Sequence, residues 1–199
     1  MPVESADPRI VQLRRLFENR PATAVGRRPE HREAAVSLLL RPHTTLELLL
    51  IRRAEFGGDP WSGHVALPGG RRGYGDADLL VTACRETEEE VGVPLARVGT
   101  FIGSLDEVTP GTPILPPVVI APFVMAVPSH TRTVPDPREV QSAIWVPLAA
   151  LRDTAAMSEI VIDTPRASGS FPSLVYDDLV IWGLTYRILR QFLDITEGL

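Results

Sequence analysis

The sequence of 199 residues contains one cysteine, Cys84, so no disulfide bond can form within the chain. It also lacks an apolar run of transmembrane length, and its first residues lack the apolar core of a signal peptide. These absences predict a cytoplasmic protein that does not insert into a membrane. Positive charge is not in excess either: the net charge is −5, whereas binding to a nucleic-acid polymer needs a basic surface. We therefore expect no nucleic-acid polymer among its partners.

The composition is ordinary for one globular domain. Hydrophobic residues make up 44% and charged residues 23% of the chain, and 199 residues are enough for a sizeable core. Arginine pairs nevertheless occur at positions 27–28, 52–53 and 71–72. Local positive charge on an acidic protein favours a small phosphorylated ligand over a polymer.

Hydrophobic periodicity predicts a mixed α/β architecture. Residues 8–20 have apolar side chains at helical spacing and are expected to pack on the main domain as an amphipathic helix. Apolar runs at 34–40 and 46–52 predict two buried central strands. Further strands are expected at 64–67, 98–105, 118–127, 143–146, 160–162 and 174–176, a turn at 68–70, and helices at 148–152 and 179–195. We therefore divide the chain into an N-terminal helix and connector, residues 1–33, and a main domain, residues 34–199.

Four glutamates at positions 86, 88, 89 and 90 follow a glycine-rich turn. On a helix, Glu86, Glu89 and Glu90 fall within an arc of about 100°. Their like charges repel, and a divalent cation would turn that repulsion into ligation. Oxygen ligands alone favour Mg²⁺ or Mn²⁺ over zinc. A solvated acidic helix face is the alternative explanation, and the three glutamates taken alone do not exclude it.

The remainder of this helix has its own pattern. Asp76 or Asp78 can cap its N-terminus, and Gly92 can end it in a left-handed conformation. An arc next to the glutamates is expected to face the core and consists of Leu80, Ala83, Cys84, Thr87 and Val91. Within that arc, Cys84 is expected to be a buried, inert thiol and not a nucleophile.

The segment from residue 70 to residue 93 resembles the Nudix box, G-x5-E-x7-R-E-U-x-E-E-x-G-U, where U is a bulky aliphatic residue. The matching residues are Gly70, Arg85, Glu86, Glu89, Glu90, Gly92 and Val93. Thr87 stands at a position that is usually aliphatic, and the first acidic residue is Asp76, which eight residues separate from Arg85. So many fixed positions in one window identify the chain as a member of the Nudix hydrolase family. The resemblance implies an α/β/α sandwich with a mixed β-sheet between helices.

The resemblance also implies hydrolysis of a nucleoside diphosphate derivative by attack of water on phosphorus. Glu86, Glu89 and Glu90 would hold Mg²⁺ or Mn²⁺, and the backbone at Gly70 would add a carbonyl ligand, since glycine permits close approach. Arg85 would orient the carboxylates by charge-assisted hydrogen bonds.

The general base of such enzymes often lies outside the box. Our candidate is Glu139, and a plain surface glutamate is the alternative reading of that residue. Glu107, in a loop of residues 106–117 that is rich in proline and glycine, is a second candidate. The residues expected to contact substrate are Arg52, Arg53, His64, Gly69, Gly70 and Arg71. A structural role for His64 is the alternative.

A second resemblance concerns the substrate. Residues 49–53, 63–70 and 181–185 are similar to coenzyme A pyrophosphatase-like Nudix proteins. Ala54, Asp59 and Leu67 depart from that signature. Asp59 stands where an arginine is expected, although Arg52, Arg53, Arg71 and Arg72 could compensate. The resemblance implies cleavage of coenzyme A or acyl-coenzyme A to 3′,5′-ADP and 4′-phosphopantetheine. ADP-ribose, another nucleoside diphosphate derivative, a nucleoside triphosphate or a non-catalytic nucleotide-binding module are the alternatives, and a homodimer is compatible with the sequence.

Overall fold

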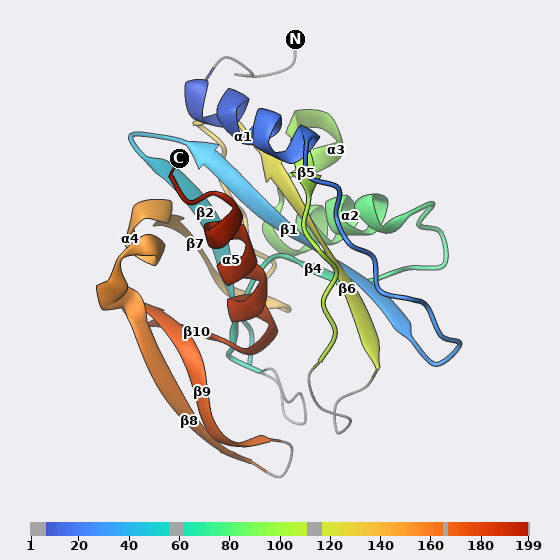
Figure 1. Cartoon of the computed structure of the whole chain (residues 1–199). Coiled ribbons are helices and arrows are strands. Elements are labelled where there is room, and N and C mark those ends of the chain that lie inside the picture. Colours follow the sequence, from blue (N-terminus) through green and yellow to red (C-terminus); the bar gives the residue numbers. More distant parts are fainter. Residues whose placement is uncertain (1–6, 56–61, 111–116, 165–166, 199) are drawn as a thin grey trace.

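The computed structural model describes residues 7–55, 62–110, 117–164 and 167–198. Its elements follow one another along the chain as shown in Figure 1. The helices are α1 (Pro8–Glu18), α2 (Leu79–Val91), α3 (Leu95–Val98), α4 (Leu148–Arg152) and α5 (Gly183–Ile195), with a short 3-10 turn at Thr154–Ala156. The strands are β1 (Arg32–Pro42), β2 (Leu46–Arg53), β3 (Val65–Ala66), β4 (Gly69–Arg71), β5 (Thr100–Ser104), β6 (Val118–Ala126), β7 (Val140–Pro147), β8 (Met157–Thr164), β9 (Ala167–Tyr176) and β10 (Leu179–Trp182).

The main sheet is mixed. Its strands run in the order β3-β2-β1-β6-β5, while β4 also pairs with β1 and β7 with β2. Strands β1 and β6 are parallel, from Arg32 opposite Val118 to Leu40 opposite Ala126, and the other pairs in this sheet are antiparallel. A smaller antiparallel sheet has the order β10-β9-β8, and its β8–β9 hairpin extends away from the body of the molecule (Figure 1).

Helices cover both faces of the main sheet. Because successive side chains of a strand point to opposite faces, Leu38 and Leu40 pack with α1 and α5 on one face, whereas Leu39 packs with α2 and α3 on the other. All three leucines are fully buried. The prediction of an α/β/α sandwich around buried central strands is therefore confirmed (Figure 1).

The N-terminal helix belongs to the first of these two cores. Ile10, Leu13 and Phe17 are buried, and the Phe17 ring stacks on Phe192 of α5 at 6.4 Å between centroids. The backbone of Gly103 in β5 lies so close to the Phe17 ring that a Cβ there would overlap it. In the part of the chain that the structure describes, no helix is long and apolar enough to cross a membrane.

Two predicted elements were wrong. The expected helix over residues 179–195 begins only at Gly183, because residues 179–182 (LVIW) pair with β9 as β10 and Gly183, at φ +64°, separates strand from helix. The expected turn at residues 68–70 instead leads into β4, whose Gly69 and Gly70 pair with Val36 and Ala35 of β1. Because glycine has no side chain, β4 can lie very close to β1. The start of the acidic motif therefore lies beside β1, in the middle of the main sheet.

Candidate active site on helix α2

Helix α2 carries the acidic motif and has the predicted ends. The Asp78 carboxylate accepts a hydrogen bond from the Val81 N–H at 2.8 Å, and Gly92 ends the helix at φ +69°. Ala83 and Thr87 are completely buried, as expected of the core-facing arc. Cys84, a member of the same arc, is only partly buried, contrary to expectation, and packs against the edge of this core. Burial raises the pKa of its thiol, which disfavours the reactive thiolate.

Thr87, the unusual residue of the motif, has a polar partner inside the core. Its hydroxyl oxygen lies 2.7 Å from the Ala83 carbonyl, to which it donates, and 3.0 Å from the Ser37 hydroxyl of β1. Ser37 is also completely buried. A threonine therefore fits this aliphatic position because a serine faces it across the helix–sheet interface.

Arg85 lies at the centre of the charged groups. It forms two hydrogen bonds to Asp76, from Nε at 3.0 Å and from Nη2 at 2.8 Å. Its Nη1 lies 2.8 Å from Glu89 Oε2 and 2.9 Å from Glu86 Oε1. The Arg85 guanidinium holds the pKa of Asp76 well below its usual range. Arg85 thus fixes the first acidic residue of the motif and two of its glutamates relative to one another.

Glu90 is the most deeply buried carboxylate of the motif, with 2% of its surface exposed. Its Oε2 accepts a hydrogen bond from the Gly69 N–H at 2.8 Å. Burial raises its pKa to about 8, and the charges of Glu86 and Glu139 act in the same direction, against the Gly69 N–H and Arg53. Burial also raises the pKa of Glu86, opposed by Arg85 and assisted by Glu89 and Glu139. The carboxylates therefore form one electrostatically coupled cluster.

The backbone places Glu139 beside this cluster although it is far away in sequence. The Glu139 carbonyl accepts from the Ala54 N–H at 2.8 Å, and the next residue, Val140, pairs with Arg53 at the end of β2. The Asp136 N–H donates to the Glu90 carbonyl at 2.9 Å, which anchors the same segment to the end of α2. Glu139 itself is solvent-exposed. The structure thus brings an exposed carboxylate, Glu139, close to the buried Glu90, and the role of Glu139 as the base stays a prediction.

Glycine shapes the floor of the site. A Cβ on Gly70 would overlap the Glu86 carboxylate, and a Cβ on Gly69, at φ +148°, would overlap the backbone of Ala35. No other residue type allows β4 to lie between β1 and the glutamates without displacing one of them.

The other residues predicted to contact substrate are more dispersed. Arg52 forms an ion pair with Asp178 at 2.6 Å, and the His64 ring lies edge-on to Trp182 at 5.1 Å. Arg71 is exposed, and its carbonyl accepts from Arg85 Nη2 at 3.1 Å. The contacts of Arg52, His64 and Arg71 with a substrate stay a prediction. Asp59, which departs from the coenzyme A signature, lies outside the described residues.

Glu107, the second candidate base, is engaged elsewhere. Arg27 donates to both of its oxygens at 2.6 Å, and the Val25 N–H donates to one of them at 2.7 Å. Arg27 lowers the pKa of Glu107, which makes this carboxylate a weaker base. Glu107 is therefore less available than the exposed Glu139, and the choice between them as the base stays a prediction.

The donor atoms fit a hard divalent cation, although the side chains are not arranged around one. Among the described residues, no group of three His, Cys, Asp or Glu side chains is placed to hold a metal ion. The reason lies in Arg85, which occupies the space between Glu86 and Glu89. The oxygen-only donor set and the raised pKa of two neighbouring carboxylates nevertheless match what Mg²⁺ or Mn²⁺ would neutralise. Glu89 is exposed and held by Arg85, so ligation by Glu89 stays a prediction.

The raised pKa of Glu90 predicts how the stability of the metal-free protein changes with pH. Between an ordinary value of 4.5 and about 8, folded Glu90 holds a proton that the unfolded chain releases. The free energy of unfolding should therefore fall as pH rises through this window, by up to about 1.4 kcal/mol per pH unit. Urea unfolding in a chelator at several pH values measures the slope. Glu90→Gln should flatten it, and an equal slope in the variant would contradict the assignment.

Comparison with known proteins places the chain in a family. The NUDIX domain model matches residues 30–163. The uncharacterized Nudix hydrolase NudL of Yersinia pestis is 32% identical over 81% of this chain and 78% of its own length. An uncharacterized protein of Schizosaccharomyces pombe is 37% identical over 74% of this chain, which spans only 46% of that relative's length.

A solved structure supports the same fold. The crystal structure of a MutT/nudix family protein from Enterococcus faecalis aligns with 93% of this chain and 73% of its own, at a TM-score of 0.57 and 15% identity. At that identity the likeness shows the architecture alone. The domain match covers more than half of the sequence and contains the complete acidic motif. The chain therefore belongs to the Nudix hydrolase family.

Proposed function

We propose that this Nudix hydrolase cleaves the pyrophosphate bond of coenzyme A or an acyl-coenzyme A in a metal-dependent reaction. The observation that carries the hydrolytic part is the coupled cluster of Glu86, Glu90 and Glu139 against the Gly69–Gly70 backbone. The coenzyme A part rests on the similarity of residues 49–53, 63–70 and 181–185 to coenzyme A pyrophosphatase-like members of the family.

Each residue of the cluster has a distinct task in this proposal. Glu86, Glu89, Glu90 and the Gly70 carbonyl would hold Mg²⁺ or Mn²⁺. The bound cation would neutralise charge on the diphosphate and make an attacking water more acidic. Glu139 accepts the proton of that water as its oxygen bonds to phosphorus and the bridging P–O bond breaks. Arg85 orients Glu86 and Glu89 relative to one another.

Product analysis by mass spectrometry tests the proposal. The purified protein is incubated with Mg²⁺ or Mn²⁺ and with coenzyme A, acetyl-coenzyme A, ADP-ribose, NADH, a dinucleoside polyphosphate or a nucleoside triphosphate. We expect the fastest reaction to give 3′,5′-ADP and 4′-phosphopantetheine from coenzyme A. Faster cleavage of another compound would keep the hydrolytic mechanism and reject coenzyme A as the substrate. Binding without cleavage of any compound would indicate a nucleotide-binding module.

Glu139→Gln tests the general base. Because the amide cannot accept the proton of water, kcat should fall about 10²-fold, the lower range of acid–base contributions. Metal affinity should hardly change, since Glu139 is exposed and stands outside α2. Steady-state kinetics and Mn²⁺ titration separate the two quantities. If Mn²⁺ affinity falls in parallel with kcat, Glu139 is a ligand and not the base.

Glu107→Gln is the matched control for this prediction. Its carboxylate is held by Arg27 and Val25 and does not face the acidic cluster, so its loss should lower kcat far less than Glu139→Gln does. A large fall in kcat for Glu107→Gln, with Glu139→Gln unaffected, would reverse the assignment.

A further inference from the structure

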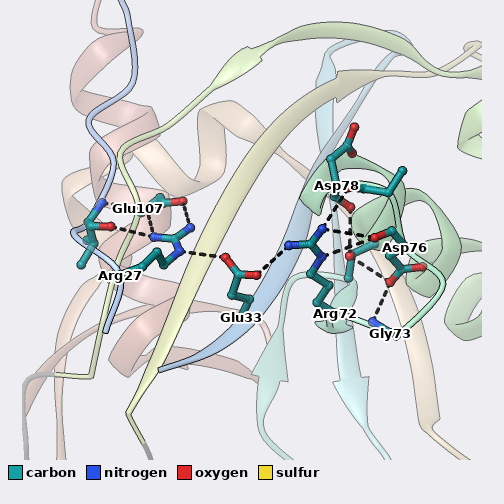
Figure 2. A network of polar contacts seen from close by, with 10 residues as sticks. Arg27, Glu33, Arg72, Gly73, Asp76, Asp78 and Glu107 are labelled. Atoms are coloured by element: carbon teal, nitrogen blue, oxygen red, sulfur yellow. Dashed lines mark hydrogen bonds and ion pairs between the residues drawn. The ribbon is translucent and has the colours of Figure 1, made fainter. Parts of the chain in front are cut away.

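A series of ion pairs runs from the connector before β1 to the acidic motif. Arg27 pairs with Glu107 at 2.6 Å and with Glu33 at 2.8 Å. The second oxygen of Glu33 accepts from Arg72 Nη1 at 2.8 Å. Figure 2 shows these side chains in one line, with Glu33 between the two guanidinium groups. The series joins the connector and the adjoining start of β1 to two segments that are distant in sequence, the loop at Glu107 and the loop after β4.

The Arg72 side chain forms hydrogen bonds to the loop that leads into α2. Its Nη2 donates to the Ala77 carbonyl at 2.9 Å and to the Asp76 carbonyl at 3.3 Å, and its Nε lies 3.4 Å from the latter (Figure 2). The Arg72 N–H also donates to the Glu33 carbonyl at 2.9 Å, which continues the pairing of β4 with β1. One planar guanidinium therefore bridges a carboxylate and two backbone carbonyls, a pattern that a lysine ammonium cannot reproduce. The whole sequence contains no lysine, so all 20 of its Lys and Arg positions are arginines.

The loop that Arg72 holds carries the Asp76 carboxylate. That carboxylate accepts from the Gly73 N–H at 2.7 Å and the Thr82 hydroxyl at 2.9 Å, which fixes its direction toward Arg85. Arg85 in turn contacts Glu86 and Glu89. Contacts of 2.8–3.4 Å thus connect Arg72, through Asp76 and Arg85, to two of the proposed metal ligands.

We propose that Arg72 is a positioning residue for the acidic motif and that Glu33, at the start of β1, and Arg27 of the connector hold it in place. The inference rests on the proposed metal-dependent function of the motif. Arg72 does not touch the glutamates itself; it sets the position of Asp76 and, through it, of Arg85. The connector is thereby part of the active-site scaffold, although it contributes no ligand or base.

The contacts of Arg72 predict a separation of function from stability. Exposed ion pairs contribute little to folding, so loss of Arg72, whose side chain is 37% exposed, should leave the protein folded. Loss of groups that orient metal ligands, in contrast, commonly weakens metal binding about 10- to 100-fold. A merely structural residue would lower the melting temperature without a selective change in metal affinity.

Mn²⁺ binding, measured by electron paramagnetic resonance, tests the inference on the full-length protein. Arg72→Gln should bind Mn²⁺ about 10-fold more weakly than the wild type, with a nearly unchanged melting temperature. Arg72→Lys should behave like Arg72→Gln, because the ammonium restores the charge without the bridging geometry. Glu33→Gln should weaken binding in the same direction, and the double variant should be no weaker than Arg72→Gln, since both residues act through one contact.

Arg190→Gln is the matched control, because Arg190 forms an ion pair with Asp194 on α5 and is 32% exposed. It should bind Mn²⁺ as the wild type does. Wild-type Mn²⁺ affinity in both Arg72→Gln and Glu33→Gln would overturn the inference and leave the proposed function standing. If Arg72→Gln does not fold, Glu33→Gln decides alone. Absence of Mn²⁺ binding to the wild type would instead reject the metal-dependent function itself.

Discussion

Glu90→Gln should lower turnover by about 10²- to 10³-fold at saturating Mg²⁺, the range for loss of one electrostatic contact to a transition state. Glu90 is the most buried carboxylate of the motif and receives the Gly69 N–H at 2.8 Å. The amide oxygen of glutamine can keep this hydrogen bond, so the backbone around Gly69 should not move. What disappears is the negative charge that the proposed cation needs. Steady-state kinetics, together with circular dichroism as a check on folding, measure the effect.

Glu88→Gln is the control on the same helix. Glu88 is exposed, and its side chain pairs with Arg97 at 3.5 Å. The Glu88→Gln substitution removes one negative charge from α2, as Glu90→Gln does. Turnover should nevertheless stay within about twofold of the wild type, because surface ion pairs such as Glu88–Arg97 are weak. Equal turnover in Glu90→Gln and the wild type at saturating metal would remove Glu90 from the site. Equal losses in both variants would point to the net charge of the helix and not to a specific ligand.

Much of the site could be predicted because it lies on one regular element. A period of 3.6 residues places Glu86, Glu89 and Glu90 on one arc of α2 and Ala83 and Thr87 on the next, as the burial of the latter two confirms. The helix ends could also be predicted from residue type. Asp78 accepts a hydrogen bond from a backbone N–H at the N-terminus, and Gly92 adopts the left-handed conformation at the C-terminus. The fold could be predicted for a similar reason. Continuous apolar runs indicate strands that are buried on both faces, which requires a sheet with helices on either side.

The remaining features depend on contacts between distant segments. Glu33 and Arg72 are 39 residues apart in sequence, and nothing in the periodicity of either segment indicates that they meet. The same holds for Ser37 and Thr87. The Ser37 hydroxyl gives the buried Thr87 hydroxyl a hydrogen-bond partner only because β1 packs against α2 in the fold. Strand β10 was mistaken for helix because four apolar residues fit either period; pairing with β9 decided the outcome. Short apolar runs are ambiguous until the partner strand is known.

The two glycines of β4 should respond differently to the same substitution. Gly69→Ala places a methyl group on the Ala35 backbone at φ +148°, which side chains rarely adopt, so the free energy of unfolding should fall by about 1–3 kcal/mol or more. Gly70→Ala places the methyl group on the Glu86 carboxylate, the end of a flexible side chain. That side chain can move aside, so the protein should fold with near wild-type stability but lose most of its metal affinity and turnover. Urea unfolding and Mn²⁺ titration measure the two effects.

Gly75→Ala provides the control, because Gly75 lies in the loop before α2 with no atom within 4 Å of an added Cβ. It should leave both stability and turnover near the wild-type values. A stable and fully active Gly70→Ala variant would mean that Glu86 does not need its place beside the β4 backbone. Glu86 would then lose its role as a ligand fixed by that backbone. If Gly70→Ala is as unstable as Gly69→Ala, the close approach of β4 serves the sheet alone. A selective loss of metal affinity in Gly70→Ala would instead show that this glycine is required by the carboxylate it faces, independently of the strand it belongs to.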